Sequence, residues 1–198
     1  AKAISYAWNK PLVGVNHLRG HIAAVMLAQP EIEMPSLGLL ISGGHSEIVY
    51  VNPDFSLQML AETRDDAAGE TLDKFGRVLG LGYPAGPTID KMCHVGNLNA
   101  IPYPNTRLKD NSLDFSFSGL KTSLRYLIEK MSIEEVQARM PDLCASYQQA
   151  VIDALSRKMR VAIEQGGALR YRSLGLSGGV SNNKTLRAAL GTLAKHKR

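Results

Sequence analysis

The spacing of apolar residues along the chain predicts both helices and strands. Positions 141–165 read as one long amphipathic helix, and short apolar runs bounded by glycine, proline or asparagine read as strands. The predicted helices cover 1–8, 17–28, 65–79, 88–96, 118–127, 141–165 and 182–195, with a short one after Ser132. The predicted strands cover 11–15, 36–42, 47–52, 57–61, 115–117 and 173–176.

Residues at the ends of these segments match known helix-capping preferences. Asn16 and Ser118 are predicted N-caps, because a side-chain oxygen there accepts hydrogen bonds from the first free backbone N–H groups. Ser132, with glutamate three residues later, has the form of a capping box. The pair Gly166-Gly167 is predicted to close the helix 141–165.

The order of the elements predicts the fold class. A Gly-Gly turn joins 36–42 to 47–52, which is typical of a hairpin. Three strands, then several helices, one strand and a last helix indicate a mixed α/β fold with right-handed crossovers near the end. The segment 29–35, with two prolines and two glutamates, is the best candidate for a linker.

Composition narrows the function classes only a little. The 198 residues are 44% hydrophobic and 21% charged, which is ordinary for a soluble globular protein. A formal charge of +5 permits an anionic partner such as RNA without requiring one. Two distant cysteines suit a reducing cytosol, and no apolar run approaches the length of a membrane span, so we expect a cytoplasmic protein. The start resembles the inside of a helix, so we expect residues to precede Ala1.

His17 and His21 lie four residues apart at the start of a predicted helix. Side chains at this spacing share one helical face, so the two imidazoles can bind a single metal ion. The alternative is a pair of solvated or capping histidines. A zincin-type protease is a poor interpretation, because that chemistry needs a glutamate after the first histidine and this chain has Leu18.

Two glycine-rich turns are candidate phosphate sites. Ser42-Gly43-Gly44 and Ser177-Gly178-Gly179 each follow a predicted strand, and the second precedes a helix. Glycine lets backbone N–H groups approach an anion, and a helix N-terminus adds positive potential. Either turn alone is more often a plain turn. Together with the turn at 83–87 they favour a nucleotide cleft, in which the two Gly-Gly turns close on one ligand.

Acidic and basic residues near these turns have competing interpretations. Asp65 and Asp66 at the start of the helix 65–79 are explained by complementing the helix dipole. Asp73 lies two turns into that helix, where a carboxylate can accept hydrogen bonds from ribose hydroxyls. Lys121 opposes the dipole preference in the first turn of its helix, which weakly suggests contact with a ligand or a tRNA phosphate.

Six motifs stand in one order over about residues 1–195, and in this respect the chain resembles the TsaD family. The motifs are Val-Asn-His-Leu-Arg-Gly-His, Leu-Ile-Ser-Gly-Gly-His, Asp-Asp-Ala-Ala-Gly-Glu-Thr-Leu-Asp-Lys, Tyr-Pro-Ala-Gly-Pro-Thr-Ile-Asp, Phe-Ser-Phe-Ser-Gly-Leu-Lys-Thr and Ser-Gly-Gly-Val-Ser-Asn-Asn. The resemblance implies an actin/Hsp70/sugar-kinase-like (ASKHA) fold of two α/β lobes. It also implies transfer of threonylcarbamoyl from threonylcarbamoyl-adenylate to N6 of the adenosine beside the anticodon (position 37) in tRNAs that read ANN codons.

The family's site residues are carried over position by position. His17 and His21 match its metal-binding histidines. The expected donor-binding residues are Leu40, Ile41, Ser42, Gly43, Gly44, Asp73, Gly86, Asp90 and Asn183. The resemblance implies one divalent ion, iron or zinc, whose third protein ligand is an aspartate in a family segment that this chain lacks. Ala85 replaces a common glycine, a change that looks tolerable because Gly86 is retained.

The resemblance also implies an organisation and partners. We expect 1–30 to be the tail of the first lobe and 31–198 the second lobe, incomplete at its end, in a chain truncated at both ends. Expected partners are tRNA, the bacterial paralogue TsaB and the ATPase TsaE, with no membrane; the truncated chain is expected to be inactive alone. The alternatives are a non-catalytic nucleotide-binding scaffold and the metalloprotease of the family's historical name.

Overall fold

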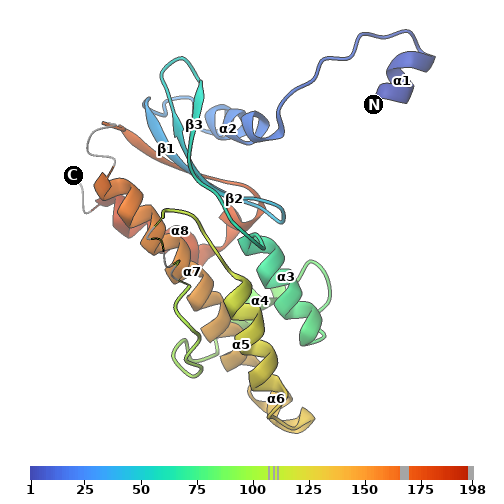
Figure 1. Ribbon diagram of the computed structural model, residues 1–198, viewed down its shortest axis with the longest axis vertical. Helices are drawn as coiled ribbons and strands as arrows, with labels where there is room; N and C mark the ends of the chain where they lie inside the picture. The colour runs from blue at the N-terminus through green and yellow to red at the C-terminus, as the bar shows by residue number, and fades with distance from the viewer. Residues whose placement is uncertain (107, 109, 111, 166–169, 196–198) are drawn as a thin grey trace. The chain divides into compact units, whose positions relative to one another are not determined.

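The structure is a computed structural model that describes residues 1–106, 108, 110, 112–165 and 170–195 (Figure 1). The chain divides into two compact units, Ala1–Glu31 and Ile32–Arg198, and each is described by itself. Within the described ranges, no helix is both long enough and apolar enough to cross a bilayer.

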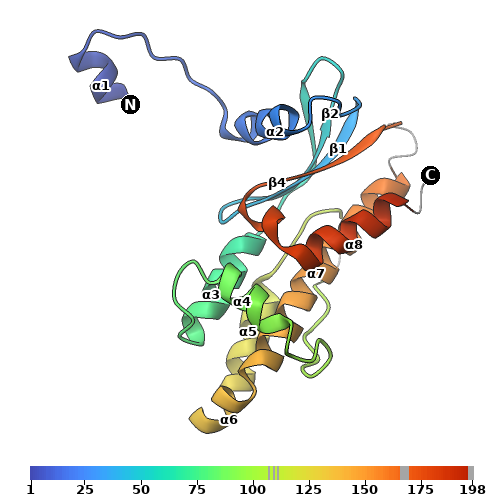
Figure 2. The same cartoon turned by 180° about the vertical axis from the view of Figure 1, so that it is seen from behind.

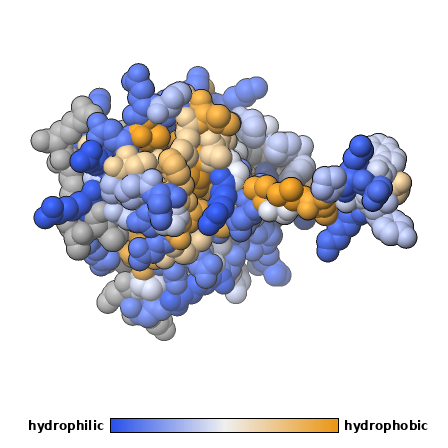
Figure 3. All heavy atoms as spheres, turned by 90° about the horizontal axis from the view of Figure 1, so that it is seen from above, coloured by the Kyte–Doolittle hydropathy of each residue, from blue (hydrophilic) through white to orange (hydrophobic). Residues whose placement is uncertain are grey.

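The first unit contains two helices, α1 (Lys2–Ala7) and α2 (His17–Ala28). Asn16 caps α2 as predicted: its Oδ1 accepts hydrogen bonds from the backbone N–H groups of Leu18 at 2.9 Å and Arg19 at 3.3 Å. The strand predicted at 11–15 is wrong, because this segment has no regular structure and its apolar side chains are exposed (Figure 3). A strand needs a neighbour for its backbone hydrogen bonds, and the described residues of this unit pair none with it.

The second unit is a four-stranded mixed sheet with helices gathered on one side of it (Figures 1 and 2). The sheet order is β3-β2-β1-β4, with β1 antiparallel to β2 and parallel to β4. The strands are β1 (Ser36–Ile41), β2 (Ser46–Val51), β3 (Leu57–Ala61) and β4 (Ser173–Ser177). The helices are α3 (Ala68–Val78), α4 (Gly86–Cys93), α5 (Ser118–Ile128), α6 (Ile133–Ala138), α7 (Met140–Gln165) and α8 (Lys184–Lys195). The mixed α/β class is therefore confirmed.

The core forms where alternate residues of the sheet meet the helices. Leu37, Leu39 and Ile41 of β1 belong to one buried cluster with residues of α3, α4, α5 and α7. Within it Phe75 of α3 stacks on Tyr147 of α7, with ring centroids 4.2 Å apart. This stack joins α3 to α7 within the core.

The predicted hairpin, the strands at 57–61 and 173–176 and the helices at 1–8, 17–28 and 141–165 are confirmed, with ends within two residues. The capping box after Ser132 is also confirmed, since its Oγ accepts from Glu135 N and the Glu135 carboxylate accepts from Ser132 N. The glycines predicted to close the helix 141–165 lie outside the described residues.

Several other predicted boundaries and caps differ from those in the structure. The helix predicted at 65–79 begins only at Ala68, and the one predicted at 88–96 spans Gly86 to Cys93. In place of the strand at 115–117 there is a single bridge between Thr63 and Phe115. Ser118 is not a cap but the first residue of α5; the capping position is Phe117, and its N–H is bonded by a distant carboxylate. The last helix starts at Lys184, after a 3₁₀ turn over Gly179–Asn182.

Candidate functional site

Two Gly-Gly turns lie at the same edge of the sheet. Strands β1 and β4 are parallel neighbours, with Leu40 opposite Ser177, so both strands end at this edge. The turn 42–45 leaves β1 and the turn 178–179 leaves β4. In α/β sheets, ligands bind outside the carboxyl ends of such parallel strands. The arrangement therefore puts both candidate phosphate-binding turns beside one another.

The first turn presents bare backbone. Ser42 closes it: its N–H donates to the carbonyl oxygen of His45 at 2.8 Å, and its Oγ accepts from the N–H groups of Gly44 at 3.3 Å and His45 at 3.1 Å. Gly43 and Gly44 are exposed, and a Cβ built on either would meet no atom within 4 Å. Neither is in the left-handed region. Neither packing nor backbone conformation therefore demands glycine here, which leaves the approach of a ligand as a reason for it.

The second turn is built differently. Gly178 has φ +93°, and a Cβ on it would lie 2.2 Å from the carbonyl oxygen of Ile41. This glycine is therefore required by both conformation and close packing against β1. Gly179, the next residue, is exposed in open space and begins the 3₁₀ turn that leads into α8. One glycine holds the turn and the other leaves its backbone accessible.

The predicted residues Leu40 and Ile41 are fully buried in β1. The side chain of Ile41 belongs to the core under the helices, and that of Leu40 points to the opposite face, since neighbours in a strand alternate. Neither side chain is at the tip of the turn. Any contact of these two residues with a ligand in front of the turn must come from the backbone.

Asp73 holds the turn before α4. Its Oδ1 accepts a hydrogen bond from the N–H of Ala85 at 2.8 Å. The turn sits close to α3 because Gly76 has no side chain; a Cβ there would lie 2.1 Å from that of Ala85. Gly86, the first residue of α4, has open space where a Cβ would be. Among the described residues none donates to Asp73 Oδ2, so one carboxylate oxygen remains for a ligand.

Asp90 and Asn183 are brought together by a residue that the sequence analysis missed, Gln148 of α7. Asn183 Nδ2 donates to Asp90 Oδ1 at 3.0 Å and to Gln148 Oε1 at 2.8 Å, and Gln148 Nε2 donates to the same Asp90 oxygen at 3.1 Å. Gln148 is only 2% exposed. A polar residue on the buried face of an amphipathic helix was the available signal, because such residues are rarely buried without a partner.

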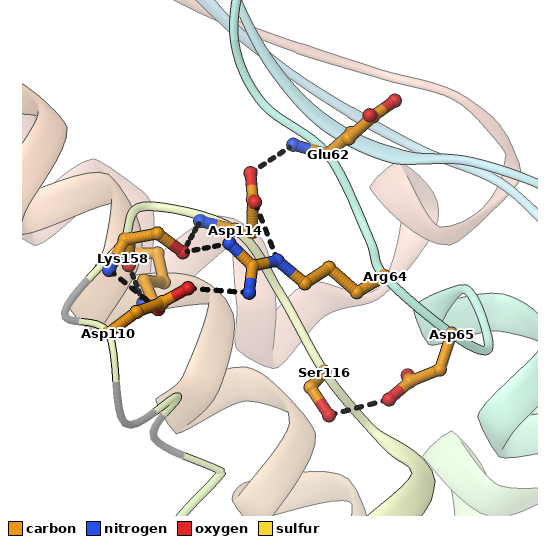
Figure 4. A network of polar contacts seen from close by, with 8 residues as sticks. Glu62, Arg64, Asp65, Asp110, Asp114, Ser116 and Lys158 are labelled. Atoms are coloured by element: carbon orange, nitrogen blue, oxygen red, sulfur yellow. Dashed lines mark hydrogen bonds and ion pairs between the residues drawn. The ribbon is translucent and has the colours of Figure 1, made fainter.

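Asp65, shown in Figure 4, and Asp66 both precede the first turn of α3 and are bonded to other groups. Asp65 accepts from Ser116 Oγ at 2.5 Å and from the N–H of Phe117 at 2.7 Å, so it caps α5 from outside that helix. Partial burial raises the pKa of Asp65, but these hydrogen bonds outweigh it and hold the pKa below its usual range. Asp66 pairs with Lys74 at 2.5 Å. A carboxylate thus already serves the start of α5, and a ligand role for Lys121 stays a prediction.

A second part of this network ties the loop before α5 to the end of β3 (Figure 4). Arg64 pairs with Asp110 at 2.6 Å and with Asp114 at 2.8 Å. Asp114 also accepts from the N–H of Glu62, and the buried Lys158 of α7 donates to the carbonyl oxygen of Ser112. These contacts join secondary-structure elements to each other, and they explain the charged residues of this region without a ligand.

His17 and His21 face one another on α2. Their Nε2 atoms are 3.1 Å apart, and their ring planes meet at 69°. Two nitrogen ligands at about 2.1 Å from one ion lie about 3.0–3.4 Å apart for angles of about 90–109°. The pair therefore fits two positions of one metal ion. No group of three or more His, Cys, Asp or Glu placed for a metal occurs among the residues that the structure describes.

The two cysteines are unsuited to nucleophilic chemistry. Cys93 and Cys144 are both buried. Burial raises the pKa of the Cys93 thiol to about 12 and that of Cys144 to about 11, so both stay protonated near neutral pH. The groups at the sheet edge that can contact a ligand are instead carboxylates, amides and backbone N–H groups.

Comparison with known proteins adds family evidence. The family described as "TsaD: tRNA N6-adenosine threonylcarbamoyltransferase" matches residues 1–198. Proteins of that name are 47% identical over 189 residues in Anaeromyxobacter dehalogenans strain 2CP-1, 46% over 191 in Moorella thermoacetica and 42% over 195 in Clostridioides difficile strain 630. These alignments cover 96%, 96% and 98% of the chain. They cover 55%, 55% and 57% of the relatives, so the chain spans little more than half their length.

Proposed function

Since the chain belongs to the TsaD family, we propose that it acts in tRNA N6-adenosine threonylcarbamoyl transfer and supplies the donor-binding sheet edge. The donor is threonylcarbamoyl-adenylate, and the acceptor is N6 of the adenosine at position 37 in tRNAs that read ANN codons. The 42–47% identity to proteins named for this transfer supports the activity. An ASKHA-like fold of two lobes, of which 31–198 is mostly the second, is part of the same proposal.

One observation carries the proposal: two Gly-Gly turns end neighbouring parallel strands, with open glycines in front of each. Backbone N–H groups in such turns are suited to phosphate oxygens. Asp73 and Asp90 flank the turn at Ala85 and each keep one oxygen without a described donor. Carboxylates at this position suit ribose hydroxyls. A site that offers backbone N–H groups to a phosphate and carboxylates to a ribose diol is suited to an adenylate.

The reaction requires no protein nucleophile. The exocyclic amine attacks the carbamoyl carbon, a C–N bond forms, and the C–O bond to the phosphate breaks as AMP leaves with the electron pair. AMP is a good leaving group as an anion, so the protein's task is to hold donor and acceptor in line. The turns at Gly43 and Gly179 bind the phosphate, and the amine gives up its proton after attack.

His17 and His21 would hold a divalent ion, iron or zinc, with their Nε2 atoms. When bound, such an ion would supply Lewis acidity. The 3.1 Å separation of the two nitrogens, which is a hydrogen-bond contact between the rings, is compatible with this assignment. Transfer also requires tRNA, and TsaB and TsaE are the proposed protein partners. The protease alternative lacks its base, because Leu18 follows the first histidine, and the scaffold alternative has no observation in its favour.

The test combines AMP binding to this chain with transfer by a protein of the relatives' full length that contains it. AMP binding is measured by calorimetry, and transfer from purified threonylcarbamoyl-adenylate is measured on tRNA with adenosine or guanosine at position 37. We expect AMP binding, and transfer only to adenosine, in the presence of the partner proteins. His17→Ala with His21→Ala abolishes transfer, whereas His94→Ala, at an exposed position away from the turns, leaves it unchanged. Undiminished transfer by the double variant would contradict the metal assignment, and absence of AMP binding would contradict the donor site.

A further inference from the structure

Asn183 has no hydrogen-bond donor left for a ligand. Both hydrogens of its Nδ2 are directed to Asp90 Oδ1 and Gln148 Oε1, and its Oδ1 accepts from the N–H of Leu186 at the start of α8. Its backbone N–H donates to the carbonyl oxygen of Val180, and its own carbonyl oxygen accepts from the N–H of Arg187. An asparagine satisfied at every donor acts on a ligand through its neighbours.

Asp90 is the member of this trio with an open group. Its Oδ1 accepts two hydrogen bonds, from Asn183 at 3.0 Å and from Gln148 at 3.1 Å, and no described residue donates to Oδ2. The side chain is half-buried and lies one turn along α4 from Gly86, which has open space where a Cβ would be. The two amides therefore hold the carboxylate through Oδ1 and leave its second oxygen without a described donor.

We propose that Gln148 is a positioning residue for the donor: together with Asn183 it holds Asp90 so that Oδ2 accepts a hydrogen bond from a ligand hydroxyl. Gln148 suits this task because one amide group both donates to Asp90 and accepts from Asn183. Its burial in α7, at 2% exposure, keeps the amide in place before the ligand arrives. The inference rests on the proposed function, since it concerns the same nucleotide site.

The test measures the dissociation constant for AMP in wild type, Gln148→Met, Gln148→Glu and a matched control, Gln149→Met. Gln149 is the next residue of α7, and its Nε2 donates to Asp153 at 2.7 Å, outside the trio. In Gln148→Met the shape is kept and both hydrogen bonds are lost, so we expect affinity about tenfold weaker, equal to about 1.4 kcal/mol. Gln149→Met is expected to bind AMP as the wild type does.

Gln148→Glu gives a signature that a packing role cannot produce. An ionised glutamate repels Asp90 and cannot donate, whereas its protonated form has one donor and one acceptor, like the amide. The affinity of this variant relative to wild type should therefore recover as the pH falls from about 7.5 to 5. Wild type measured at each pH corrects for pH effects that the substitution does not introduce, including titration of the AMP phosphate. Cys93, the thiol beside Asp90, stays neutral throughout because burial raises its pKa to about 12.

The outcomes separate this inference from the proposed function. Equal AMP affinity of wild type and Gln148→Met would overturn the inference alone, as would an equal loss in Gln149→Met. A wild-type chain without affinity for AMP would overturn the donor site and the inference with it. If Gln148→Met fails to fold, the pH series of Gln148→Glu decides: recovery at low pH supports the positioning role, and its absence overturns it.

Discussion

The two turns at the sheet edge have the same sequence, Ser-Gly-Gly, but their glycines are there for different reasons. At the end of β1, Gly43 and Gly44 are exposed, have ordinary φ values and face open space. At the end of β4, Gly178 has φ +93°, and a Cβ would meet the backbone of Ile41 at 2.2 Å. Identical motifs therefore divide into an accessible turn and a structural turn, and only the surroundings distinguish them.

The accessible turn is supported from behind by another glycine. A Cβ on Gly69, in the first turn of α3, would lie 2.6 Å from the carbonyl oxygen of Ser42. The neighbouring N–H of Ala68 donates to Ser46 Oγ at 2.8 Å. Helix α3 thus braces the hairpin, and β1 itself braces the second turn through Gly178. The comparison predicts which glycines matter for folding and which for binding.

The largest effect is expected at Gly178. In Gly178→Ala, a left-handed conformation costs about 1–2 kcal/mol and overlap with fixed backbone about 1–3 kcal/mol. We therefore expect the free energy of unfolding to fall by about 3 kcal/mol or more. Urea denaturation followed by circular dichroism measures it. A loss below about 1 kcal/mol would show that the second turn is as tolerant as the first.

A smaller loss, up to about 2 kcal/mol, is expected for Gly69→Ala. Alanine favours a helix over glycine by about 1 kcal/mol, but the overlap with Ser42 is with a backbone carbonyl that cannot rotate away. The matched control is Gly191→Ala in α8, where the added Cβ has open space and the same unfolding measurement should show a gain of up to about 1 kcal/mol. If both variants are stabilised, Gly69 does not brace the hairpin.

Much of the fold was predictable because it depends on local sequence. Asn16 and Ser132 cap the helices that follow them, and the strands of the hairpin are near-continuous apolar runs with a Gly-Gly turn. One kind of failure occurs where a distant residue replaces a local one. Ser118 has the sequence of an N-cap, yet the capping position is Phe117, whose N–H donates to Asp65, more than fifty residues away. No local pattern contains that contact.

The candidate site shows the same limit. The motifs indicate Asp73, Asp90 and Asn183. They do not show that both side-chain N–H groups of Asn183 already donate to Asp90 and Gln148. Nor do they distinguish Gly178 from Gly43, since φ and the distance to Ile41 depend on how β4 pairs with β1. Residue identities are readable in sequence, whereas the division of roles between them follows from tertiary packing.

The buried face of the hairpin beside the accessible turn offers a pH-dependent test. Glu47 of β2 is 7% exposed, and its Oε2 has no hydrogen-bond partner among described residues. Burial raises its pKa; His45 lowers it, and Glu62 raises it further. A raised carboxyl pKa means that the folded state binds the proton more tightly. The stabilising contribution is thus present below about pH 4.3, the ordinary value, and is lost as the pH rises through the folded-state pKa.

Glu47→Gln removes that titration. Relative to wild type, the variant should gain stability between about pH 4 and pH 7, by about 1 kcal/mol, or about 2–4 °C in melting temperature. Thermal unfolding of both proteins at the two pH values measures the difference. Gln58→Glu, at an exposed position of β3, is the control and should add no comparable pH dependence. A constant difference between variant and wild type at both pH values would mean that Glu47 does not titrate abnormally.

The smallest change in stability is expected at the accessible turn. Gly43→Ala adds a methyl group in open space at an ordinary φ, so the free energy of unfolding should change by less than about 0.5 kcal/mol. The same methyl group stands where the donor phosphate approaches the backbone, so the AMP dissociation constant should rise about tenfold or more. Gly119→Ala, equally open but at the start of α5, should leave AMP binding unchanged. Loss of stability without loss of AMP binding would reverse the roles assigned to the two turns, because Gly43 would then be a structural glycine like Gly178.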